Sequence, residues 1–205
     1  MMPYASRTGT KRNLDALRAA GWRLLVSARG VLRNEGFPYA LDNGAWTAYQ
    51  RGEAFDVNAF ERAIWLLGRD ADWIVAPDIV AGGVESLAFT ESWLHRLRFA
   101  RLVLIAVQDG MTPNDVRPLL GRKRGIFLGG TTDWKISTMR QWGALSREVG
   151  CHFHVGRVNT RRRIRMCADA GAHSFDGTSA SRFAVTLPKL DAEVRQGHLF
   201  AGVGT

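Results

Sequence analysis

Residues 102–130 read LVLIAVQDGMTPNDVRPLLGRKRGIFLGG. The stretch holds an unbroken apolar run at residues 102–107, a polar turn, a helical segment that begins at Pro113 after Thr112, and a second apolar run at residues 126–128. Apolar runs that do not alternate with polar residues are typical of strands buried on both faces of a parallel sheet. The stretch therefore predicts a strand–helix–strand unit of an α/β protein.

The same alternation extends in both directions over the whole chain. We predict eight strands, at residues 3–6, 23–27, 38–41, 73–77, 102–107, 126–128, 153–155 and 174–175. Helical spacing, with cap residues such as Asp56, Thr112 and Gly171, predicts helices at residues 10–20, 57–68, 84–100, 113–120, 133–149, 160–170 and 187–196. Eight such strands predict an α/β fold of the compact (β/α)8 TIM-barrel type, as a single domain over residues 1–205.

A doubly wound open sheet is the alternative to the barrel. The chain has 205 residues, at the lower end of the roughly 200 to 400 that such barrels occupy. In addition, only a short loop follows the strand at residues 23–27, where a barrel would have a helix. Both observations leave the open sheet in competition.

The composition is that of a folded, basic protein. Lys and Arg together number 28 against 19 Asp and Glu, which gives a formal charge of +9. Excess positive charge favours a polyanionic partner such as nucleic acid. The 24 arginines and 4 lysines suit bidentate phosphate binding, although a GC-rich genome produces the same bias.

Two features indicate the compartment. The two cysteines, Cys151 and Cys167, are too few for a disulfide framework, and no charged segment followed by an apolar one opens the chain. No apolar stretch approaches the ~20 residues that cross a bilayer. We therefore predict a cytoplasmic protein without membrane attachment.

Polar and glycine residues follow most of the predicted strands. Catalytic groups in parallel α/β proteins come from the carboxyl ends of the strands. The candidate groups are Asp42-Asn43-Gly44-Ala45-Trp46, Asp78, Gln108-Asp109-Gly110, Gly129-Gly130, Gly156-Arg157 and Asp176-Gly177-Thr178. We expect three carboxylates, an amide and three glycines from these groups to meet at one rim.

Each of these residues also has a purely structural interpretation. Asp42 and Asp176 precede glycine-containing turns, where an aspartate side chain often bonds the backbone two residues on. Asp78 could cap the next helix, Gln108 could be a solvated loop residue, and the two glycines at 129–130 could form a tight turn. Five successive strands that all end in such groups favour a shared site over independent turns.

In their order along the chain, these motifs resemble those of the tRNA-guanine transglycosylase superfamily, and within it the DNA-modifying DpdA-like branch of bacterial and phage 7-deazaguanine pathways. Phe175-Asp176-Gly177-Thr178-Ser179-Ala180-Ser181-Arg182 is similar to the family's nucleophile motif. Asp42-Asn43-Gly44-Ala45-Trp46 and His154-Val155-Gly156 resemble its general-base motif and its Gly-Val-Gly strand end. The family's zinc subdomain has no counterpart, because no cysteine follows Asp176; this departure fits a DNA substrate better than tRNA.

The resemblance implies a role for each site residue. Asp176 would be the nucleophile that holds the sugar covalently, and Asp42 the proton shuttle, acid and then base. Asp78 would accept the N1 and N2 protons of guanine, and Gln108 together with the amide of Gly129 or Gly130 would donate to O6. Gly156 would also line the base pocket. Trp46 or Phe175 would stack on the base, with packing in the core as the alternative.

Arginines near the last strands are candidates for contacts with the DNA backbone. Arg157, Arg161 and Arg182 are predicted to contact phosphate, with a solvated helix face as the alternative for the run at residues 161–165 and an ion pair with Asp176 as the alternative for Arg182. No metal site is predicted at the two cysteines and the nearby histidines, because strand alternation separates Cys151 from His152 and His154, and Cys167 lies on a predicted helix. No cofactor is predicted.

These observations support three hypotheses. The first is a DNA guanine transglycosylase that inserts a free 7-deazaguanine base, such as the 7-cyano form, into DNA. The second is base exchange on tRNA or simple base release. The third is a basic barrel that binds nucleic acid without catalysis. The sequence does not indicate the oligomeric state.

Overall fold

The computed structural model of the protein describes residues 1–182 and 185–200, and these form a closed, all-parallel barrel of eight strands. The strands are β1 Met2–Ser6, β2 Arg23–Ser27, β3 Tyr39–Asp42, β4 Ile74–Val75, β5 Val103–Val107, β6 Arg124–Leu128, β7 Phe153–Val155 and β8 Ser174–Gly177. Each strand pairs with the next, and β1 also pairs with β8, which closes the barrel. The (β/α)8 prediction is confirmed, and the open-sheet alternative is wrong.

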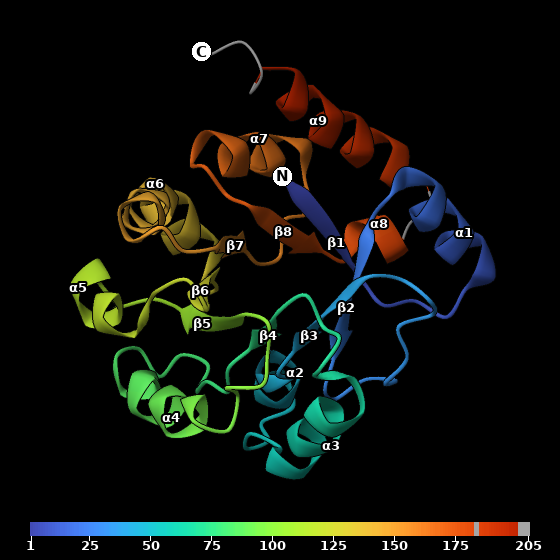
Figure 1. Cartoon of the computed structure of the whole chain (residues 1–205). Coiled ribbons are helices and arrows are strands. Elements are labelled where there is room, and N and C mark those ends of the chain that lie inside the picture. Colours follow the sequence, from blue (N-terminus) through green and yellow to red (C-terminus); the bar gives the residue numbers. More distant parts are fainter. Residues whose placement is uncertain (183–184, 201–205) are drawn as a thin grey trace.

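Helices surround the strands (Figure 1). They are α1 Lys11–Ala20, α2 Ala45–Gln50, α3 Val57–Leu67, α4 Glu85–Leu94, α5 Pro113–Val116, α6 Thr132–Val149, α7 Arg161–Asp169, α8 Ser179–Arg182 and α9 Leu187–Phe200. As expected, the connection from β2 to β3 is a loop without a helix. None of the described helices is long and apolar enough to cross a lipid bilayer.

Local signals in the sequence set several helix ends. The Asp56 carboxylate accepts a hydrogen bond of 3.0 Å from the Ala59 amide at the start of α3. At the start of α7, the Thr160 hydroxyl accepts a bond of 3.3 Å from the Arg163 amide. Such side chains satisfy amide groups that have no partner within the helix. The predicted start of α3 at Val57 is therefore confirmed, and α7 begins at Arg161, one residue after its predicted start.

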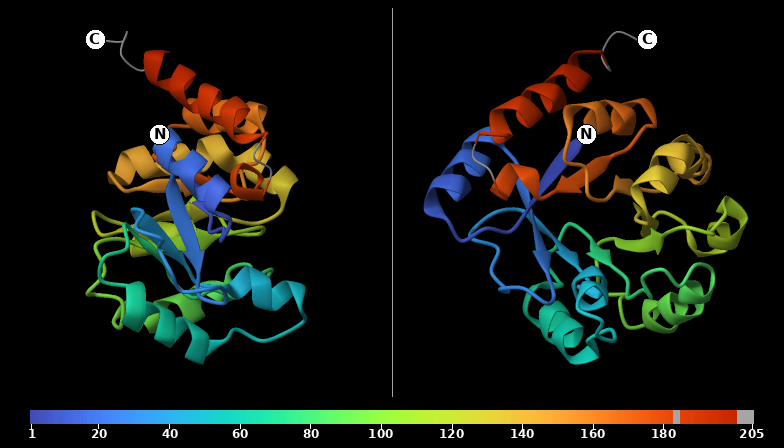
Figure 2. Two further views of the ribbon diagram at one scale, coloured as in Figure 1. Left: turned by 90° about the vertical axis from the view of Figure 1, so that its right-hand side faces the viewer. Right: turned by 180° about the vertical axis from the view of Figure 1, so that it is seen from behind.

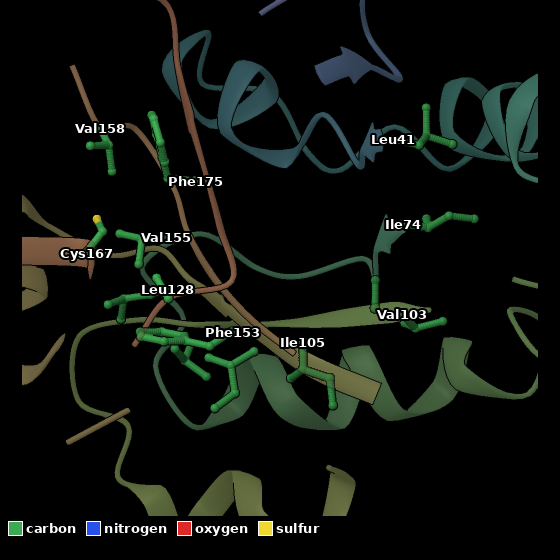
Figure 3. Close-up of a cluster of buried hydrophobic side chains, with 14 of the residues drawn as sticks. Leu41, Ile74, Val103, Ile105, Leu128, Phe153, Val155, Val158, Cys167 and Phe175 are labelled. Atoms are coloured by element: carbon green, nitrogen blue, oxygen red, sulfur yellow. The ribbon is translucent and has the colours of Figure 1, made fainter. Parts of the chain in front are cut away.

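Alternation along the strands divides the apolar residues into two groups. One group fills the barrel interior and consists of Tyr4, Ala40, Trp73, Val75, Leu104 and Ala106. The other faces the helices, as Figure 3 shows for strand residues such as Leu41, Ile74 and Phe153. Because successive residues of a strand point to opposite sides, the polar residues that share a phase with the interior group also face the barrel axis.

The C-terminal helix α9 lies outside the ring, against α7, α8 and α1 (Figure 2). Two arginines of α7 reach across to it: Arg161 Nε lies 2.9 Å and Arg165 Nε 3.1 Å from the Glu193 carboxylate. Glu193 is almost fully buried, and a buried carboxylate requires such a partner. These ion pairs therefore fix α9 to the outside of the barrel.

Candidate active site

Three aspartates meet at the carboxyl ends of the strands, as the sequence predicts. Asp42 ends β3, Asp78 follows β4, and Asp176 lies in β8. Asp78 and Asp176 are buried and Asp42 is partly buried. The negative charges of Asp176 and Asp78 both act on Asp42. This mouth of the barrel is therefore an acidic site of three carboxylates.

The environment of two of these carboxylates favours the protonated form. The pKa of Asp42 is raised from 3.8 to about 6, chiefly by burial and also by the charges of Asp176 and Asp78, against the hydrogen bond from Gly44. Burial also raises the pKa of Asp78 to about 6, and its bond from Asn43 opposes the rise. Both groups can therefore give or take a proton near neutral pH.

Asp176 is held by hydrogen bonds to both of its carboxylate oxygens. His154 Nε2 lies 3.0 Å from Asp176 Oδ2, and the Arg157 amide donates to Oδ1 over 3.2 Å. His154 itself is completely buried. It packs among aromatic rings of the barrel interior, with its ring centroid 4.9 Å from that of Phe127 and 4.5 Å from that of Trp73. The contacts fix the orientation of the Asp176 carboxylate.

The motif around Asp42 forms the predicted turn and also builds the site. Asp42 Oδ2 accepts from the Gly44 amide over 3.1 Å, and Gly44 adopts a φ of +81°, which favours glycine. The next residue, Asn43, is buried and donates through Nδ2 to Ala76 O and to Asp78 Oδ1, each over 2.7 Å. The turn thus ties the end of β3 to the segment after β4.

Gln108 is engaged by the loop between β4 and α4. Its Oε1 accepts from the Ala81 amide over 2.6 Å, and its Nε2 donates to Ile79 O over 2.8 Å. The side chain therefore positions that loop, and the solvated-loop interpretation is wrong because Gln108 is buried. Its predicted contact with a base stays a prediction that depends on the second Nε2 hydrogen.

The glycines at the ends of β6 and β7 differ in whether they can supply a backbone amide or space to the site. The Gly129 amide donates to Val107 O over 2.8 Å within the barrel, so of the two predicted amide donors only Gly130 remains a candidate. Gly130 has a φ of +71°, and a Cβ there would lie 2.4 Å from Asp109 Oδ2. At Gly156, a Cβ would lie 2.8 Å from the Phe127 ring and 3.4 Å from Asp176 Oδ2, so the small residue leaves room beside the carboxylate.

Arg157 covers part of the mouth. Its guanidinium lies 4.1 Å from the centroid of the Trp46 ring, a cation–π contact, and donates to Gly130 O. Trp46 is 39 % exposed and also stacks on Tyr49, with centroids 5.7 Å apart. A base that stacks on Trp46 would have to displace or join these rings and the guanidinium. Stacking on Phe175 is excluded, because that residue is fully buried in the outer core against Trp22.

The other two predicted phosphate ligands lie on helices that follow the last two strands. Arg161 pairs with Glu193 of α9, and Arg182 ends α8 with its side chain exposed. Their contacts with phosphate stay predictions. The sequence did not single out Lys135 of α6, which is buried and donates from Nζ to Gly156 O over 2.5 Å. The pKa of Lys135 is lowered to about 8, chiefly by burial and also by the charge of Arg157.

Within residues 1–182 and 185–200, no group of three or more His, Cys, Asp or Glu side chains has the geometry to hold a metal ion. Cys167 packs in the outer core shown in Figure 3. Burial raises the pKa of its thiol to about 12. The thiol of Cys167 is therefore protonated and does not act as a nucleophile or metal ligand in this state.

Comparison with known proteins identifies the fold class. No family model matches the chain, and no curated protein matches it. Among solved structures, RipC from Yersinia pestis is similar with a TM-score of 0.54 at 13 % identity, over 93 % of this chain and 94 % of that chain.

Two further structures share the fold. One is the magnesium complex of β-methylaspartase from Clostridium tetanomorphum, with a TM-score of 0.54 at 11 % identity, over 98 % of this chain and 59 % of that one. The other is the tryptophan synthase complex from Pyrococcus furiosus, with a TM-score of 0.51 at 13 % identity, over 97 % of this chain and 94 % of that one. At these identities the likeness defines the class of protein, a TIM barrel that also occurs in enzymes, and nothing finer.

Proposed function

We propose that this protein is a DNA guanine transglycosylase, which exchanges a guanine in DNA for a free 7-deazaguanine base through a covalent aspartyl-glycosyl intermediate. The observation that carries the proposal is the pairing of two kinds of carboxylate at one mouth. Asp176 is oriented by two hydrogen bonds, and Asp42 has a pKa raised to about 6. Retaining displacement at a sugar needs a nucleophilic carboxylate and a separate proton shuttle.

In the first half of the reaction, an oxygen of Asp176 attacks C1′ of the deoxyribose. The bond between C1′ and N9 of guanine breaks, and its electron pair leaves with the base. A proton from Asp42 neutralises the departing base, which the raised pKa of Asp42 makes available near neutral pH. The sugar stays attached to the protein as an ester of Asp176.

In the second half, the 7-deazaguanine occupies the vacated position. Asp42 takes the proton from its N9, and N9 forms the new bond to C1′. The ester bond to Asp176 breaks, and its electron pair returns to the carboxylate. The second buried aspartate, Asp78, keeps one oxygen free of the Asn43 bond and would accept the N1 and N2 protons of either base. Both bases present the same hydrogen-bonding edge, so one site serves both.

The target base has to leave the duplex before this chemistry, and base flipping requires a grip on the backbone. The net charge of +9 supplies the long-range attraction to DNA. Arg157 lies at the mouth, where its contacts with Trp46 and Gly130 would open as the flipped nucleotide enters.

The test is base exchange measured with radiolabelled guanine and with 7-cyano-7-deazaguanine, on duplex DNA and on tRNA, followed by mass spectrometry of the nucleosides. The intact protein should incorporate the base into DNA. Asp176→Ala should lose both the exchange and the covalent protein–DNA adduct, whereas Asp133→Asn, an exposed acid in the first turn of α6, should keep them.

Each other outcome would point to a different function. Exchange confined to tRNA would replace the DNA substrate, and release of guanine without incorporation would make the protein a glycosidase. If DNA binds but neither exchange nor release occurs, the barrel is a binding protein. Exchange that persists in Asp176→Ala would remove Asp176 as the nucleophile.

A further inference from the structure

A chain of polar side chains runs through the barrel interior below Asp176. Asp176 Oδ2 contacts His154 Nε2 over 3.0 Å, His154 Nδ1 contacts Ser174 Oγ over 2.8 Å, and Ser174 Oγ contacts His152 Nε2 over 2.7 Å. Ser174 and His154 are completely buried. Buried polar groups in an otherwise apolar interior are costly unless every partner is satisfied, so this row of hydrogen-bonded side chains calls for a functional explanation.

We propose that His154 is the positioning residue of the Asp176 nucleophile, and that Ser174 and His152 fix the tautomer with which His154 donates to it. This inference rests on the proposed function, because it takes Asp176 as the reacting carboxylate. It assigns a role to three residues that the resemblance to the transglycosylases does not place in the reaction.

The protonation state of the two histidines determines which atom donates in each of these hydrogen bonds. Burial lowers the pKa of His152 to about 3, and burial also lowers the pKa of His154. A neutral imidazole has one N–H and one acceptor nitrogen. Since the Asp176 carboxylate only accepts, His154 must carry its proton on Nε2 and accept on Nδ1.

The rest of the chain follows from this arrangement. The Ser174 hydroxyl donates to His154 Nδ1, and its oxygen accepts from His152 Nε2. Each member therefore donates in the direction of Asp176. In this proposal His154 orients Asp176 through the hydrogen bond from its single N–H. It transfers no proton during the reaction. The lone pairs of Asp176 Oδ1 that the Arg157 amide does not occupy stay available for attack.

Several charged or titratable groups of the surrounding elements lie near these four hydrogen-bonded side chains. The pH dependence of base exchange would reflect these groups as well. They are Asp42 of β3, Lys135 of α6, Arg157 after β7, Cys167 of α7, and His173 beside His152. His173 stacks on His152 with centroids 5.0 Å apart, and its Nδ1 accepts from the Phe153 amide.

The first arm of the experiment needs no activity. Long-range ¹H–¹⁵N NMR of the intact protein, with His154 assigned through His154→Gln, reports the tautomer directly. We expect His154 to be neutral and protonated on Nε2 from pH 6 to pH 8, and the Ser174→Ala variant to lose the shift that hydrogen bonding gives Nδ1. A proton on Nδ1, or a charged imidazole at neutral pH, would overturn the proposal even if exchange is confirmed.

The second arm uses base exchange with two variants of His154. His154→Phe removes the donor, and we expect kcat to fall about 10- to 100-fold, since a hydrogen bond to a charged group contributes about 1.5–3 kcal/mol. His154→Gln places an amide N–H near the same position and should recover most of the loss, with KM unchanged in both.

Thermal unfolding of both variants separates this role from a purely structural one. If His154→Gln folds like the wild type and is as inactive as His154→Phe, or if both change KM and leave kcat, the positioning role is refuted. If the wild type has the expected tautomer but exchanges no base on any substrate, the proposed function fails while the hydrogen-bond chain stands.

Discussion

Asp42 is a residue whose replacement should stabilise the protein and inactivate it at once. Its pKa rises from 3.8 to about 6 in the folded state, chiefly through burial. A carboxyl group with a raised pKa binds its proton more tightly when folded, so the stability it contributes is present at low pH. That contribution is lost as the pH rises from 3.8 through 6.

The magnitude follows from the size of the shift. A rise from 3.8 to about 6 corresponds to about 3 kcal/mol between the protonated and the ionised carboxyl. Asn mimics the neutral acid and can still accept from the Gly44 amide. Asp42→Asn should therefore raise the free energy of unfolding by up to about 3 kcal/mol at pH 8, which is about 6–12 °C in Tm for a chain of this size.

The assay is urea unfolding and calorimetry of both proteins at pH 8 and pH 5. The advantage of the variant should shrink by about 1.4 kcal/mol at pH 5, where the folded wild type has regained most of its proton. Base exchange should be lost at both pH values. A folded Asp42→Asn protein that is no more stable than the wild type at pH 8 would refute the argument.

Asp109 is the matched control on the same rim. Its carboxylate accepts from the Thr131 amide over 2.7 Å and from the Thr131 hydroxyl over 2.6 Å. These bonds lower the pKa of Asp109 despite partial burial. Its contribution is therefore present above the unfolded pKa and lost as the pH falls through the folded one, so Asp109→Asn should destabilise the protein at pH 8.

Three further substitutions test the packing and the specificity of the site. Gly143→Ala would place a Cβ 1.9 Å from Ala170 O, between α6 and the end of α7, and should destabilise the protein by at least about 1–3 kcal/mol in urea unfolding. Asp56→Ala removes the cap on the Ala59 amide and should lower the free energy of unfolding by about 1 kcal/mol. Asp78→Asn should raise the KM for free guanine more than that for hypoxanthine, which lacks the 2-amino group, in competitive exchange assays.

The parallel α/β arrangement could be predicted because the strands are recognisable in the sequence, whereas the choice between a closed barrel and an open sheet was settled by the structure. Runs such as Val103–Val107 are apolar on both faces, and a glycine, proline or capping residue bounds many of the elements. The two short helices α2 and α8 were not predicted. The first begins at Ala45 directly after the Gly44 turn, and the second spans only Ser179–Arg182, so neither is long enough to show a helical period.

The candidate site was predictable where it depends on topology alone. Carboxyl ends of parallel strands meet at one end of any such barrel, so Asp42, Asp78 and Asp176 could be grouped from their positions in the sequence. The contact between His154 and Asp176 joins side chains on neighbouring strands. It depends on the register in which His154 pairs with Ser174, and no local pattern specifies that register.

Some arginines of this protein are engaged in structural ion pairs, and others remain available to bind an anion. Arg161 and Arg165 share Glu193 and hold α9, so a count of arginines along α7 overstates the charge offered to DNA. Arg163 makes no ion pair with any described residue, and it lines one small pocket together with Lys135 and Arg157. The charge of Arg163 opposes the charged forms of both neighbours, and an anion at this edge of the mouth would relieve that repulsion. The charge that bears on the proposed function is therefore this group of three cations beside Gly156, close to the carboxylate that would hold the sugar.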